Sequence, residues 1–456
     1  MSTSYSSQNN VKITGEKICS IASYLNSLGI NSQDRIAVIM DNSVETVMLY
    51  IACLYLRVVV CPINPDHGEI EVRYCIDLVK PKKIFTNKGN LSYLKGTILF
   101  DNNILNSLLE AQELHKINYR KDDIFCITFS SGTTGKPKAI IHKAETLLSC
   151  ADVFNKFTYI NEYSVFFHVM PMFYMAGILN SILCPLVAGA KLVIGNKFGP
   201  LSPLSFWNVW LMNQINTTWL SPSMVYSILK LDRSDSLVDT IREFAESYKV
   251  FVGTATLSPE LKLEFKKRYN INLIESYGLS EVLFVSVENV KNNYFTGSVG
   301  NILPGVNIEI SPANELEIKS DYNMYGYLKE NGDILSCEKF STGDIGTIVE
   351  NELFITGRVK DLIIKGGVNI SPRKIESIIE GLDKIEQVAV IGCKDEFYGE
   401  NIACFFVGQL TEQELNEYCL KKLAPDHVPV KFIKRQELQV GPTGKIKKHE
   451  LKKFLV

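Results

Sequence analysis

Apolar residues follow two different spacings along the first part of the chain. From residue 18 to residue 28 they recur at the spacing of one helix face, and Gly29 marks the expected end of that helix. The same helical spacing returns over residues 43–56. Short apolar runs typical of buried strands occupy residues 35–40, 58–63 and 84–86. Strands that alternate with helices predict a parallel sheet covered by helices on both faces.

The strand pattern continues and then changes character towards the C-terminus. Strand-like runs occupy residues 124–127, 139–142, 191–194, 217–220, 250–252, 271–274 and 306–319, and a helix is predicted over residues 183–190. After residue 360 we expect a hairpin, a helix capped by Ser371 with Pro372 in its first turn, and further strands. The predicted fold class is α/β. A large N-terminal domain of parallel-sheet layers with helices carries a β-rich subdomain, and a small α+β domain follows it.

Composition narrows the class of protein further. A chain of 456 residues with 46% hydrophobic and 21% charged residues is typical of a globular protein with more than one domain. A net charge of −2 gives no electrostatic reason to bind nucleic acid. Apolar runs such as residues 58–63 are far too short to span a membrane, and residues 1–10 lack the pattern of a signal peptide. The eleven cysteines form no C-x-x-C pair. We therefore expect a cytoplasmic address.

The stretch with the clearest chemistry is residues 128–138, Thr-Phe-Ser-Ser-Gly-Thr-Thr-Gly-Lys-Pro-Lys. It lies between two strand-like runs. Its glycines let the backbone turn and approach a ligand closely. Its N–H groups and hydroxyls suit phosphate oxygens, and its lysines add positive charge. On composition alone, a solvated hairpin loop remains the alternative.

This order of residues resembles the phosphate-loop motif of the adenylate-forming (ANL) superfamily, which includes acyl-CoA synthetases, peptide-synthetase adenylation domains and luciferases. Every position of the motif is filled. The resemblance implies that the loop binds the phosphates of ATP and that Thr133 also takes part in catalysis. The phosphate-binding residues that it implies are Ser130, Ser131, Gly132, Thr133, Thr134, Gly135 and Lys138.

Further segments resemble other motifs of the same superfamily, in the same order. Residues 253–255, Gly-Thr-Ala, resemble the turn that packs against adenine, which implies roles for Gly253, Thr254 and Ala255. Residues 276–281, Ser-Tyr-Gly-Leu-Ser-Glu, resemble the Tyr-Gly-x-Thr-Glu motif with Ser280 in place of threonine. A tyrosine offers a flat face for adenine and a carboxylate is a hard ligand for Mg²⁺. The nucleotide-binding residues implied here are Ser276, Tyr277, Gly278 and Ser280, with Glu281 as the metal ligand and a catalytic residue.

Residues 341–344 match the Thr-Gly-Asp motif, and the resemblance implies that Asp344 binds the ribose hydroxyls of the nucleotide. Residues 357–361 resemble the hinge of the superfamily, where Arg358 contacts ribose and Lys360 holds the hinge position. The hinge divides the chain into a large domain, residues 1–359, and a small mobile domain, residues 360–456. Near the end, Lys445 matches the lysine of a Pro-x-x-Gly-Lys loop and is the predicted catalytic donor. The segment with Gly366 and Gly367 is implied to face the pantetheine thiol.

Residues 171–177, Pro-Met-Phe-Tyr-Met-Ala-Gly, resemble the segment that forms the acid-pocket wall of the superfamily. Tyr174 takes the usual histidine position, and His168 upstream does not match it. By itself, such a cluster of methionine and aromatic residues is more often core than pocket. No aspartate stands at or beside Tyr174 to hold an ammonium group, so a simple carboxylic acid is favoured over an α-amino acid. The predicted pocket residues are Phe173, Tyr174, Met175, Gly177 and Leu279.

The resemblance implies a two-step reaction that uses ATP, Mg²⁺ and coenzyme A. A carboxylic acid first forms acyl-AMP and pyrophosphate, and a thiol then attacks the mixed anhydride. Two alternatives stay open from the sequence. The acceptor is either coenzyme A or the phosphopantetheine of a separate acyl carrier protein, and a non-catalytic nucleotide-binding protein is the rival outside enzymes.

Overall fold

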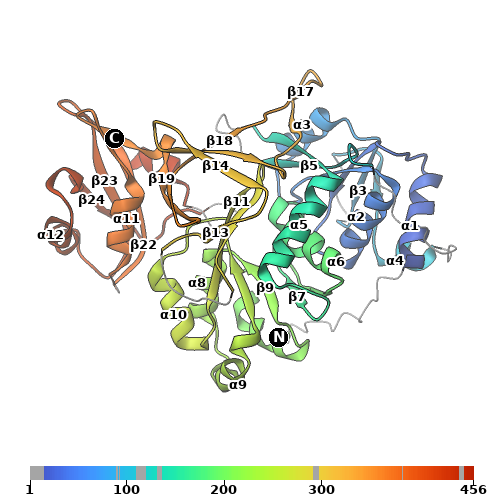
Figure 1. Ribbon diagram of the computed structural model, residues 1–456, viewed down its shortest axis with the longest axis horizontal. Helices are drawn as coiled ribbons and strands as arrows, with labels where there is room; N and C mark the ends of the chain where they lie inside the picture. The colour runs from blue at the N-terminus through green and yellow to red at the C-terminus, as the bar shows by residue number, and fades with distance from the viewer. Residues whose placement is uncertain are drawn as a thin grey trace. The chain divides into compact units, whose positions relative to one another are not determined.

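The computed structural model describes residues 15–88, 91, 93–108, 120–130, 136–290, 297–382, 384–440 and 446–455. Packing divides the chain into two units. The first contains Met1–Gly199 and Tyr322–Glu338, and the second contains Pro200–Asp321 and Lys339–Val456. The expected α/β fold class is confirmed, because strands and helices alternate through much of the chain (Figure 1).

The first unit begins with strands and helices in alternation. Its strands are β1 (Arg35–Ile39), β2 (Val59–Pro62), β3 (Lys83–Thr86), β4 (Thr97–Leu99), β5 (Ile124–Ser130), β6 (Lys138–Lys143), β7 (Val165–His168), β8 (Lys191–Ile194), β16 (Gly326–Leu328) and β17 (Ile334–Leu335). Its helices are α1 (Gly15–Ser27), α2 (Val44–Leu56), α3 (Glu69–Val79), α4 (Asn102–Ser107), α5 (Ala144–Thr158), the π-helix η1 (Ala176–Leu183) and α6 (Cys184–Ala188). The helix predicted over residues 183–190 therefore begins earlier than expected, at Ala176.

Pairing in the first unit runs in the order β17-β16-β6-β5-β2-β1-β3-β4. The strands from β5 to β4 in this order are parallel, as predicted. β6 turns back antiparallel to β5, and β16 then adds to β6 in the antiparallel sense. β7 and β8 form a separate parallel pairing. The β5–β6 hairpin thus places the two ends of the predicted phosphate loop side by side.

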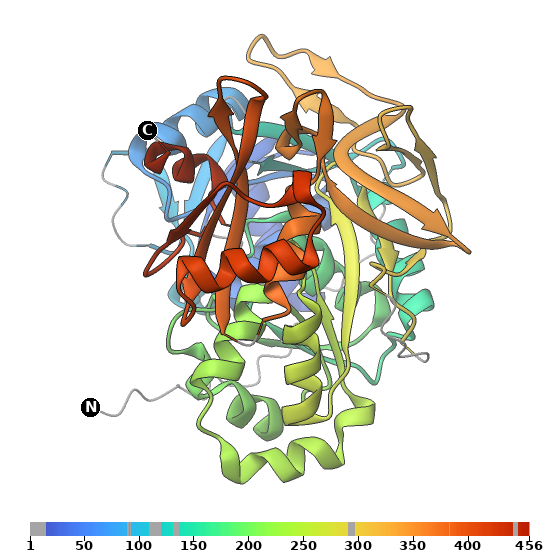
Figure 2. The same ribbon diagram turned by 90° about the vertical axis from the view of Figure 1, so that its left-hand side faces the viewer.

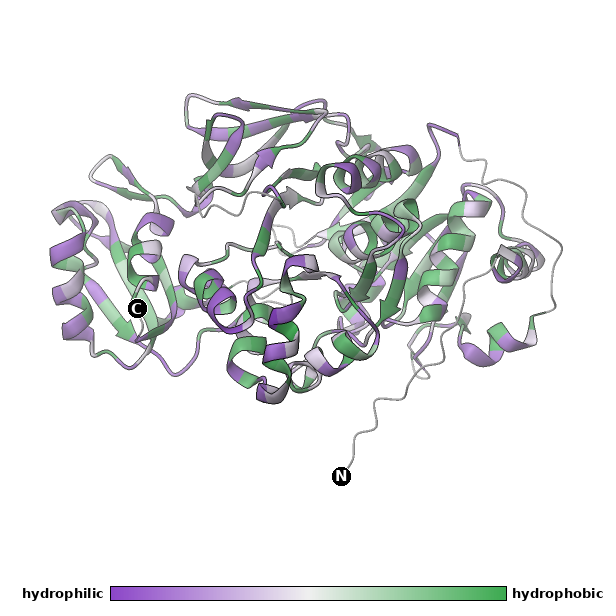
Figure 3. Cartoon of the chain, turned by 60° about the horizontal axis from the view of Figure 1, so that its bottom comes forward, coloured by the Kyte–Doolittle hydropathy of each residue, from purple (hydrophilic) through white to green (hydrophobic). Residues whose placement is uncertain are grey.

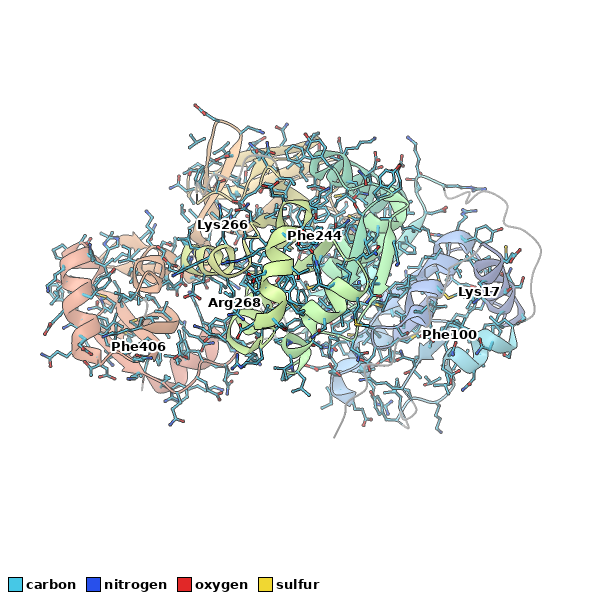
Figure 4. The ribbon with its side chains drawn as sticks, turned by 90° about the horizontal axis from the view of Figure 1, so that it is seen from below. Lys17, Phe100, Phe244, Lys266, Arg268 and Phe406 are labelled. Carbon is cyan, nitrogen blue, oxygen red and sulfur yellow. The ribbon has the colours of Figure 1, made fainter. Side chains whose placement is uncertain are left out.

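The apolar side chains of this sheet form its core. Figure 3 shows the strands mainly in green and the helices with purple stretches, in keeping with strands buried on both faces. Phe100, labelled in Figure 4, is fully buried and makes an edge contact with the ring of Phe85 at 6.0 Å between centroids. The hydrophobic effect of this burial is the main favourable term in folding.

The second unit contains a parallel layer that continues into antiparallel strands. Its strands up to residue 358 are β9 (Thr217–Leu220), β10 (Lys249–Val252), β11 (Leu273–Leu279), β12 (Leu283–Val287), β13 (Asn301–Ile302), β14 (Val306–Ile310), β15 (Glu315–Ser320), β18 (Phe340–Val349) and β19 (Glu352–Arg358). Its helices there are the 3₁₀ turns η2 (Ser202–Leu204), η3 (Asp235–Leu237) and η4 (Ala245–Ser247), and α7 (Phe206–Met212), α8 (Pro222–Leu231), α9 (Val238–Glu243) and α10 (Pro259–Tyr269). β9, β10 and β11 are parallel, and the pairing continues antiparallel through β12, β13, β19, β18, β15 and β14.

The C-terminal residues of the second unit form a sheet of their own. The strands are β20 (Ile363–Lys365), β21 (Val368–Ile370), β22 (Ile385–Asp395), β23 (Gly399–Gly408) and β24 (Lys431–Lys434). The helices are η5 (Val359–Asp361), α11 (Pro372–Glu380), α12 (Glu412–Lys422), η6 (Pro425–His427), α13 (Lys448–Leu451) and η7 (Lys452–Phe454). Figure 2 shows these orange and red strands with helices beside them. Phe406, labelled in Figure 4, is fully buried in their core.

The helix predicted after Ser371 is confirmed, but its predicted cap is not. α11 begins at Pro372, yet the Ser371 hydroxyl makes no capping bond. It donates instead to the backbone oxygen of Thr356 at 2.7 Å. A tertiary contact with the end of β19 has therefore replaced the local one.

The predicted domain boundary after residue 359 falls inside the second unit, at η5, and stays a prediction. Among the described residues, no helix is both long and apolar enough to cross a membrane.

The close packing of η1 against the chain before it generates a test of stability. A Cβ atom at Gly177 would lie 2.0 Å from the backbone oxygen of Pro171, where backbone leaves no room for it. We expect Gly177→Ala to destabilise the protein by about 3 kcal/mol, since a core that is already packed must shift. The measurement is the urea midpoint of unfolding.

Gly199→Ala is the matched control, because the nearest atom to its added Cβ would be 3.9 Å away. Its free energy of unfolding is expected to stay within about 0.5 kcal/mol of that of the wild type. Equal midpoints for the two variants would contradict the packing described at Gly177.

Candidate active site

The predicted adenine turn follows β10, at the carboxyl end of the parallel strands. Val252 of β10 lies opposite Glu275 of β11, so the residues after each strand meet at one edge. A Cβ at Gly253 would lie 3.0 Å from the backbone oxygen of Ser276. Thr254 has a left-handed backbone, with φ of +70°, and Ala255 next to it is partly exposed. The structure therefore brings the turn at Gly253 and the motif that begins at Ser276 together.

The Tyr-Gly motif lies within a strand, and here the sequence-based prediction was wrong. We expected the strand to end at residue 274, but β11 continues to Leu279 because β12 pairs with it in the antiparallel sense. The register shifts between Tyr277 and Gly278. A Cβ at Gly278 would lie 2.1 Å from the backbone oxygen of Leu283. This close approach of two backbones is what requires glycine.

Asp344 is the centre of a hydrogen-bonded group that joins three strands. The Tyr277 hydroxyl donates to Asp344 Oδ2 at 2.7 Å, and Arg358 Nε donates to Asp344 Oδ1 at 2.6 Å. Asp344 and Arg358 are opposite partners of β18 and β19. Only 2% of Asp344 is exposed. Three residues predicted to touch nucleotide are thus in direct contact with one another.

The Asp344 carboxylate has lone-pair positions beyond those used by its bonds to Tyr277 and Arg358. A carboxylate has about four lone-pair positions, and each oxygen of Asp344 uses one for a protein donor in these two bonds. The remaining positions can accept hydrogen bonds from a ribose. Burial raises the pKa of Tyr277 well above its usual range, and the charge of Asp344 raises it further. Tyr277 therefore stays a hydroxyl donor at neutral pH.

Thr342 of the motif and Glu315, which the sequence did not single out, hold the Asp344 turn in place. Gly343 has φ of +73°, a conformation that favours glycine. Its N–H donates to Glu315 Oε1 at 2.8 Å, and the Asp344 N–H donates to the Thr342 hydroxyl at 3.0 Å. The Thr-Gly-Asp motif itself signals Thr342, but nothing local marks Glu315, which lies on the neighbouring strand β15.

A second charged group lies beneath β11 and was also missed from sequence. Lys262 Nζ of α10 lies 3.2 Å from Glu275 Oε1 and 2.6 Å from Glu288 Oε1. The Glu275 N–H also donates to Glu288 Oε2 at 2.8 Å. Glu288 therefore receives the shorter and more numerous bonds. One lysine between two nearly buried carboxylates favours a proton on Glu275.

The pKa of Glu275 agrees with this assignment. Burial raises the pKa of Glu275 from 4.5 to about 7; Glu288 adds to the rise, while Lys262 and Arg373 oppose it. Glu275 immediately precedes Ser276 and Tyr277, so its protonation is linked to the strand that carries the motif.

Glu281 and Ser280 lie in the turn between β11 and β12, and both are partly exposed. Within the described ranges, no group of three or more His, Cys, Asp or Glu residues is arranged to hold a metal ion. Magnesium usually takes one or two carboxylates and completes its shell with water and substrate phosphates. A single partly exposed carboxylate such as Glu281 fits that pattern.

The predicted acid-pocket residues divide between the two units. Phe173 and Met175 are buried in the first unit, and the rings of Phe173 and Tyr174 are 4.5 Å apart. Tyr174 is half-buried; burial raises its pKa, and the charge of Asp66 raises it further. Gly177 lies in η1, as described above. Leu279 ends β11 in the second unit and is partly buried.

His168 behaves as a structural histidine, as the sequence predicts. It is fully buried, and burial lowers its pKa to about 4. Its Nδ1 lies 3.3 Å from the backbone oxygen of Ser181. A backbone oxygen only accepts, so the neutral ring donates from Nδ1 in this contact.

The remaining predicted residues lie at the ends of loops. Ser130 and Lys138 are opposite partners at the ends of β5 and β6, and Lys138 Nζ lies 5.4 Å from the centre of the Tyr327 ring. Lys360 is exposed in η5. Gly366 and Gly367, with φ of +57° and +85°, form the turn between β20 and β21. Six of the predicted site residues lie outside the described residues: Ser131, Gly132, Thr133, Thr134, Gly135 and Lys445.

Comparison with known proteins decides the family. A sequence model of the AMP-binding enzyme matches residues 14–328, and a model of the AMP-binding enzyme C-terminal domain matches residues 374–445. The chain belongs to the AMP-binding enzyme family. The expected membership of the adenylate-forming superfamily is therefore confirmed. Curated relatives of this AMP-binding enzyme are named as CoA ligases.

Two of these relatives cover nearly the whole chain. The long-chain-fatty-acid–CoA ligase FadD13 of Mycobacterium tuberculosis strain H37Rv is 27% identical over 470 residues, which span 94% of this chain and 90% of that protein. The 2-succinylbenzoate–CoA ligase of Staphylococcus epidermidis is 28% identical over 469 residues, which span 97% and 93%. ATP-bound MatB from Rhodopseudomonas palustris has a TM-score of 0.84 at 23% identity and covers 96% of this chain and 92% of that one. This last likeness shows the fold.

The buried carboxylates of this AMP-binding enzyme generate a prediction on pH. Folded Glu275 keeps a proton that the unfolded chain releases above pH 4.5, so the stability that it contributes is lost as pH rises from about 4.5 to 7. Glu275→Gln, which mimics the protonated acid, is expected to raise stability relative to the wild type by about 3 kcal/mol at pH 8 and by little at pH 5. Urea unfolding midpoints over this range measure it.

Glu264→Gln is the control, because Glu264 is exposed on the same helix as Lys262. Its stability relative to the wild type is expected to show no such trend. A difference between Glu275→Gln and the wild type that stays constant from pH 5 to pH 8 would contradict the proton on Glu275.

Proposed function

We propose that this AMP-binding enzyme is a carboxylate–CoA ligase. It activates a carboxylic acid with ATP to form acyl-AMP and pyrophosphate, and then transfers the acyl group to the thiol of coenzyme A. The observation that carries the proposal is the contact of Tyr277, Asp344 and Arg358 beside the Gly253 turn. The names of its curated relatives support coenzyme A as the acceptor.

The described residues account for recognition of the nucleoside. Asp344 accepts hydrogen bonds from the ribose hydroxyls, and Arg358 keeps the carboxylate oriented for them. Tyr277, held by its own hydroxyl, presents its ring to adenine. The tight backbone at Gly253 and Gly278 leaves no side chain between these strands and the ligand. These are rigid strand positions, so the site is organised before ATP binds.

The chemical steps follow from the charges involved. A carboxylate oxygen attacks the α-phosphorus of ATP, a bond to the bridging oxygen breaks, and pyrophosphate leaves. Because an anion attacks a polyanion, donors must stabilise the transition state. We assign this role to Lys445 and Thr133, with the phosphates held by Ser130, Ser131, Gly132, Thr134, Gly135 and Lys138. The thiolate of coenzyme A then attacks the acyl carbon, and AMP leaves.

Glu281 would hold Mg²⁺ together with phosphate oxygens. The ion supplies positive charge that offsets the charge of the phosphates. Ser280 in the same turn offers its hydroxyl to the nucleotide phosphate.

Between the two steps, we propose that residues 360–456 turn about Lys360 as a mobile domain. This movement removes Lys445 after adenylation and brings the exposed Gly366-Gly367 turn to the thiol. The movement would also exclude water while acyl-AMP persists, as closing segments do in many enzymes.

The acid that we propose is a simple carboxylic acid with an apolar or aromatic body. In the first unit, Phe173 and Met175 give apolar side chains, and Tyr174 adds one hydroxyl. No carboxylate stands at position 174 or beside it to pair with an ammonium group, and an unpaired buried charge is costly. A cytoplasmic address remains a prediction from sequence.

The experiment that tests this function measures pyrophosphate release with Mg·ATP and one acid at a time, with and without coenzyme A. The acids are hexanoate, palmitate, 4-coumarate, 2-succinylbenzoate and, as an amino-acid control, alanine. We expect one of the first four to give many turnovers and a new acyl-CoA. Release that stops near one turnover in the presence of coenzyme A would favour a carrier protein as acceptor. Absence of release with every acid would contradict the proposal.

A substitution at Lys445 separates the two half-reactions. Lys445→Ala is expected to lower adenylation by about 100-fold or more, because a donor to the developing charge is lost. Transfer from supplied acyl-AMP to coenzyme A should be retained. The two rates are measured separately in the same preparation, and an equal loss of both would contradict the role given to Lys445. Lys447→Ala, two residues away, is the control and should leave both rates unchanged.

A further inference from the structure

The segment predicted to form the acid-pocket wall is held by side chains. Asn42, in the loop between β1 and α2, uses both atoms of its amide. Its Nδ2 donates to the backbone oxygen of Met170 at 2.8 Å, and its Oδ1 accepts from the Met172 N–H at 3.0 Å. Pro171 between them has no N–H. The Tyr50 hydroxyl of α2 donates to the backbone oxygen of Met172 at 3.2 Å.

The other side of the same segment is bound by the turn after β8. The backbone oxygens of His168 and Val169 accept from the N–H groups of Gly195 and Phe198, at 2.9 and 3.0 Å. The backbone of residues 168 and 169 is therefore bound by other backbone groups, whereas that of residues 170 and 172 is bound by the side chain of Asn42.

Charged residues connect the two supports. Lys88 lies 3.3 Å from Asp41, the neighbour of Asn42, and 3.2 Å from Asp66. Asp66 is also paired with Lys197, which lies in the turn after β8. Within the described residues of the first unit, these ion pairs link the neighbour of Asn42 to the turn after β8 that binds residues 168 and 169. Burial, and after it the charge of Asp66, raises the pKa of Tyr174.

The wall residues follow this fixed segment directly. The Tyr174 N–H donates to the Pro171 oxygen at 3.3 Å, and the Ile178 N–H donates to the Tyr174 oxygen at 3.0 Å. Gly177 packs on the same Pro171 oxygen. A shift of the backbone at residues 170–172 must therefore move Phe173, Tyr174 and Met175 with it. Small displacements of a pocket have large effects on the use of a substrate.

We propose that Asn42 is a positioning residue for the acid substrate, because its amide fixes the backbone of residues 170–172 and through it the pocket wall. This inference rests on the proposed function. In this proposal Asn42 acts through the pocket wall and not on ATP. Its loss should therefore alter the KM for the acid and the preference among acids, and leave the KM for ATP unchanged.

The test compares Asn42→Ala, Asn42→Asp and Tyr50→Phe with the wild type. The probes are hexanoate, palmitate, 4-coumarate and 2-succinylbenzoate, used singly with Mg·ATP and coenzyme A. For Asn42→Ala we expect the KM for the preferred acid to rise roughly 10-fold and the ranking of the acids to change. Tyr50→Phe removes one bond of the three and should give a smaller change, about 3-fold.

Asn42→Asp provides a readout that a general loss of structure would not give. The carboxylate keeps the acceptor for Met172 but faces the Met170 oxygen without a proton to donate. Its KM for the acid should be higher than that of the wild type at pH 8, and should approach the wild-type value as the pH is lowered and the carboxyl group gains a proton. A KM defect that is equal at every pH would count against the donor role.

Asn213→Ala is the matched control. Asn213 is also partly buried, and its Nδ2 donates to a backbone oxygen, that of Val209, at 2.9 Å. It should change neither KM. If the wild type releases pyrophosphate with an acid but Asn42→Ala keeps the same acid KM and ranking, the inference is overturned and the function stands. A fall in kcat alone would also overturn it. Absence of acid-dependent release from the wild type overturns the proposed function first.

Discussion

A carboxylate that is almost out of contact with water is the constraint on which the nucleotide site depends. Such a group is costly to bury unless charged and hydrogen-bonding partners meet it. Asp344 obtains them from Tyr277 and Arg358, which come from two other strands. Satisfying this one group therefore fixes the relative positions of β11, β18 and β19. The polar face that results is the one that we propose binds the ribose of ATP.

The charged group of Lys262, Glu275 and Glu288 next to β11 is stabilised in a different way. Lys262 stands between Glu275 and Glu288, so two acidic groups share one positive charge. A proton on Glu275 restores the balance, since its surroundings disfavour a second negative charge. The hydrogen bonds to Glu288 are short and numerous, while Glu275 has a single longer one. The strand that carries Tyr277 thus rests on a group whose charge changes near neutral pH.

In the first unit, backbone groups after β7 also need hydrogen-bond partners, and neutral side chains supply them. The chain must leave the sheet after β7 to form the wall around Tyr174, and its backbone groups need partners there. Asn42 and Tyr50 provide them from a loop and a helix, without the cost of burying a charge. The buried ring of His168 likewise makes a neutral contact, from Nδ1 to the backbone oxygen of Ser181 in the π-helix that follows.

The sequence alone was enough to identify the family motifs and to predict most helices and strands, because both depend on the chemistry of short runs of residues. The hydroxyls and glycines of residues 128–138, the Tyr-Gly pair and the Thr-Gly-Asp turn are read directly, because each is a short run with its own backbone or ligand requirement. Alternating apolar runs likewise indicated the α/β fold. The predicted end of β11 at residue 274 and the predicted cap at Ser371 were wrong, since pairing with β12 and a bond to Thr356 outweighed local preference.

Only the tertiary structure decided which side chains meet. Asn42 and Met170 are 128 residues apart, and Tyr277 and Asp344 are 67 apart. No local spacing links such residues, because strand register and helix packing bring them together. The sequence therefore determined which chemical groups this protein has for binding ATP and an acid. The fold decided which of them are paired, buried and held in place, since those properties depend on neighbours that lie far away along the chain.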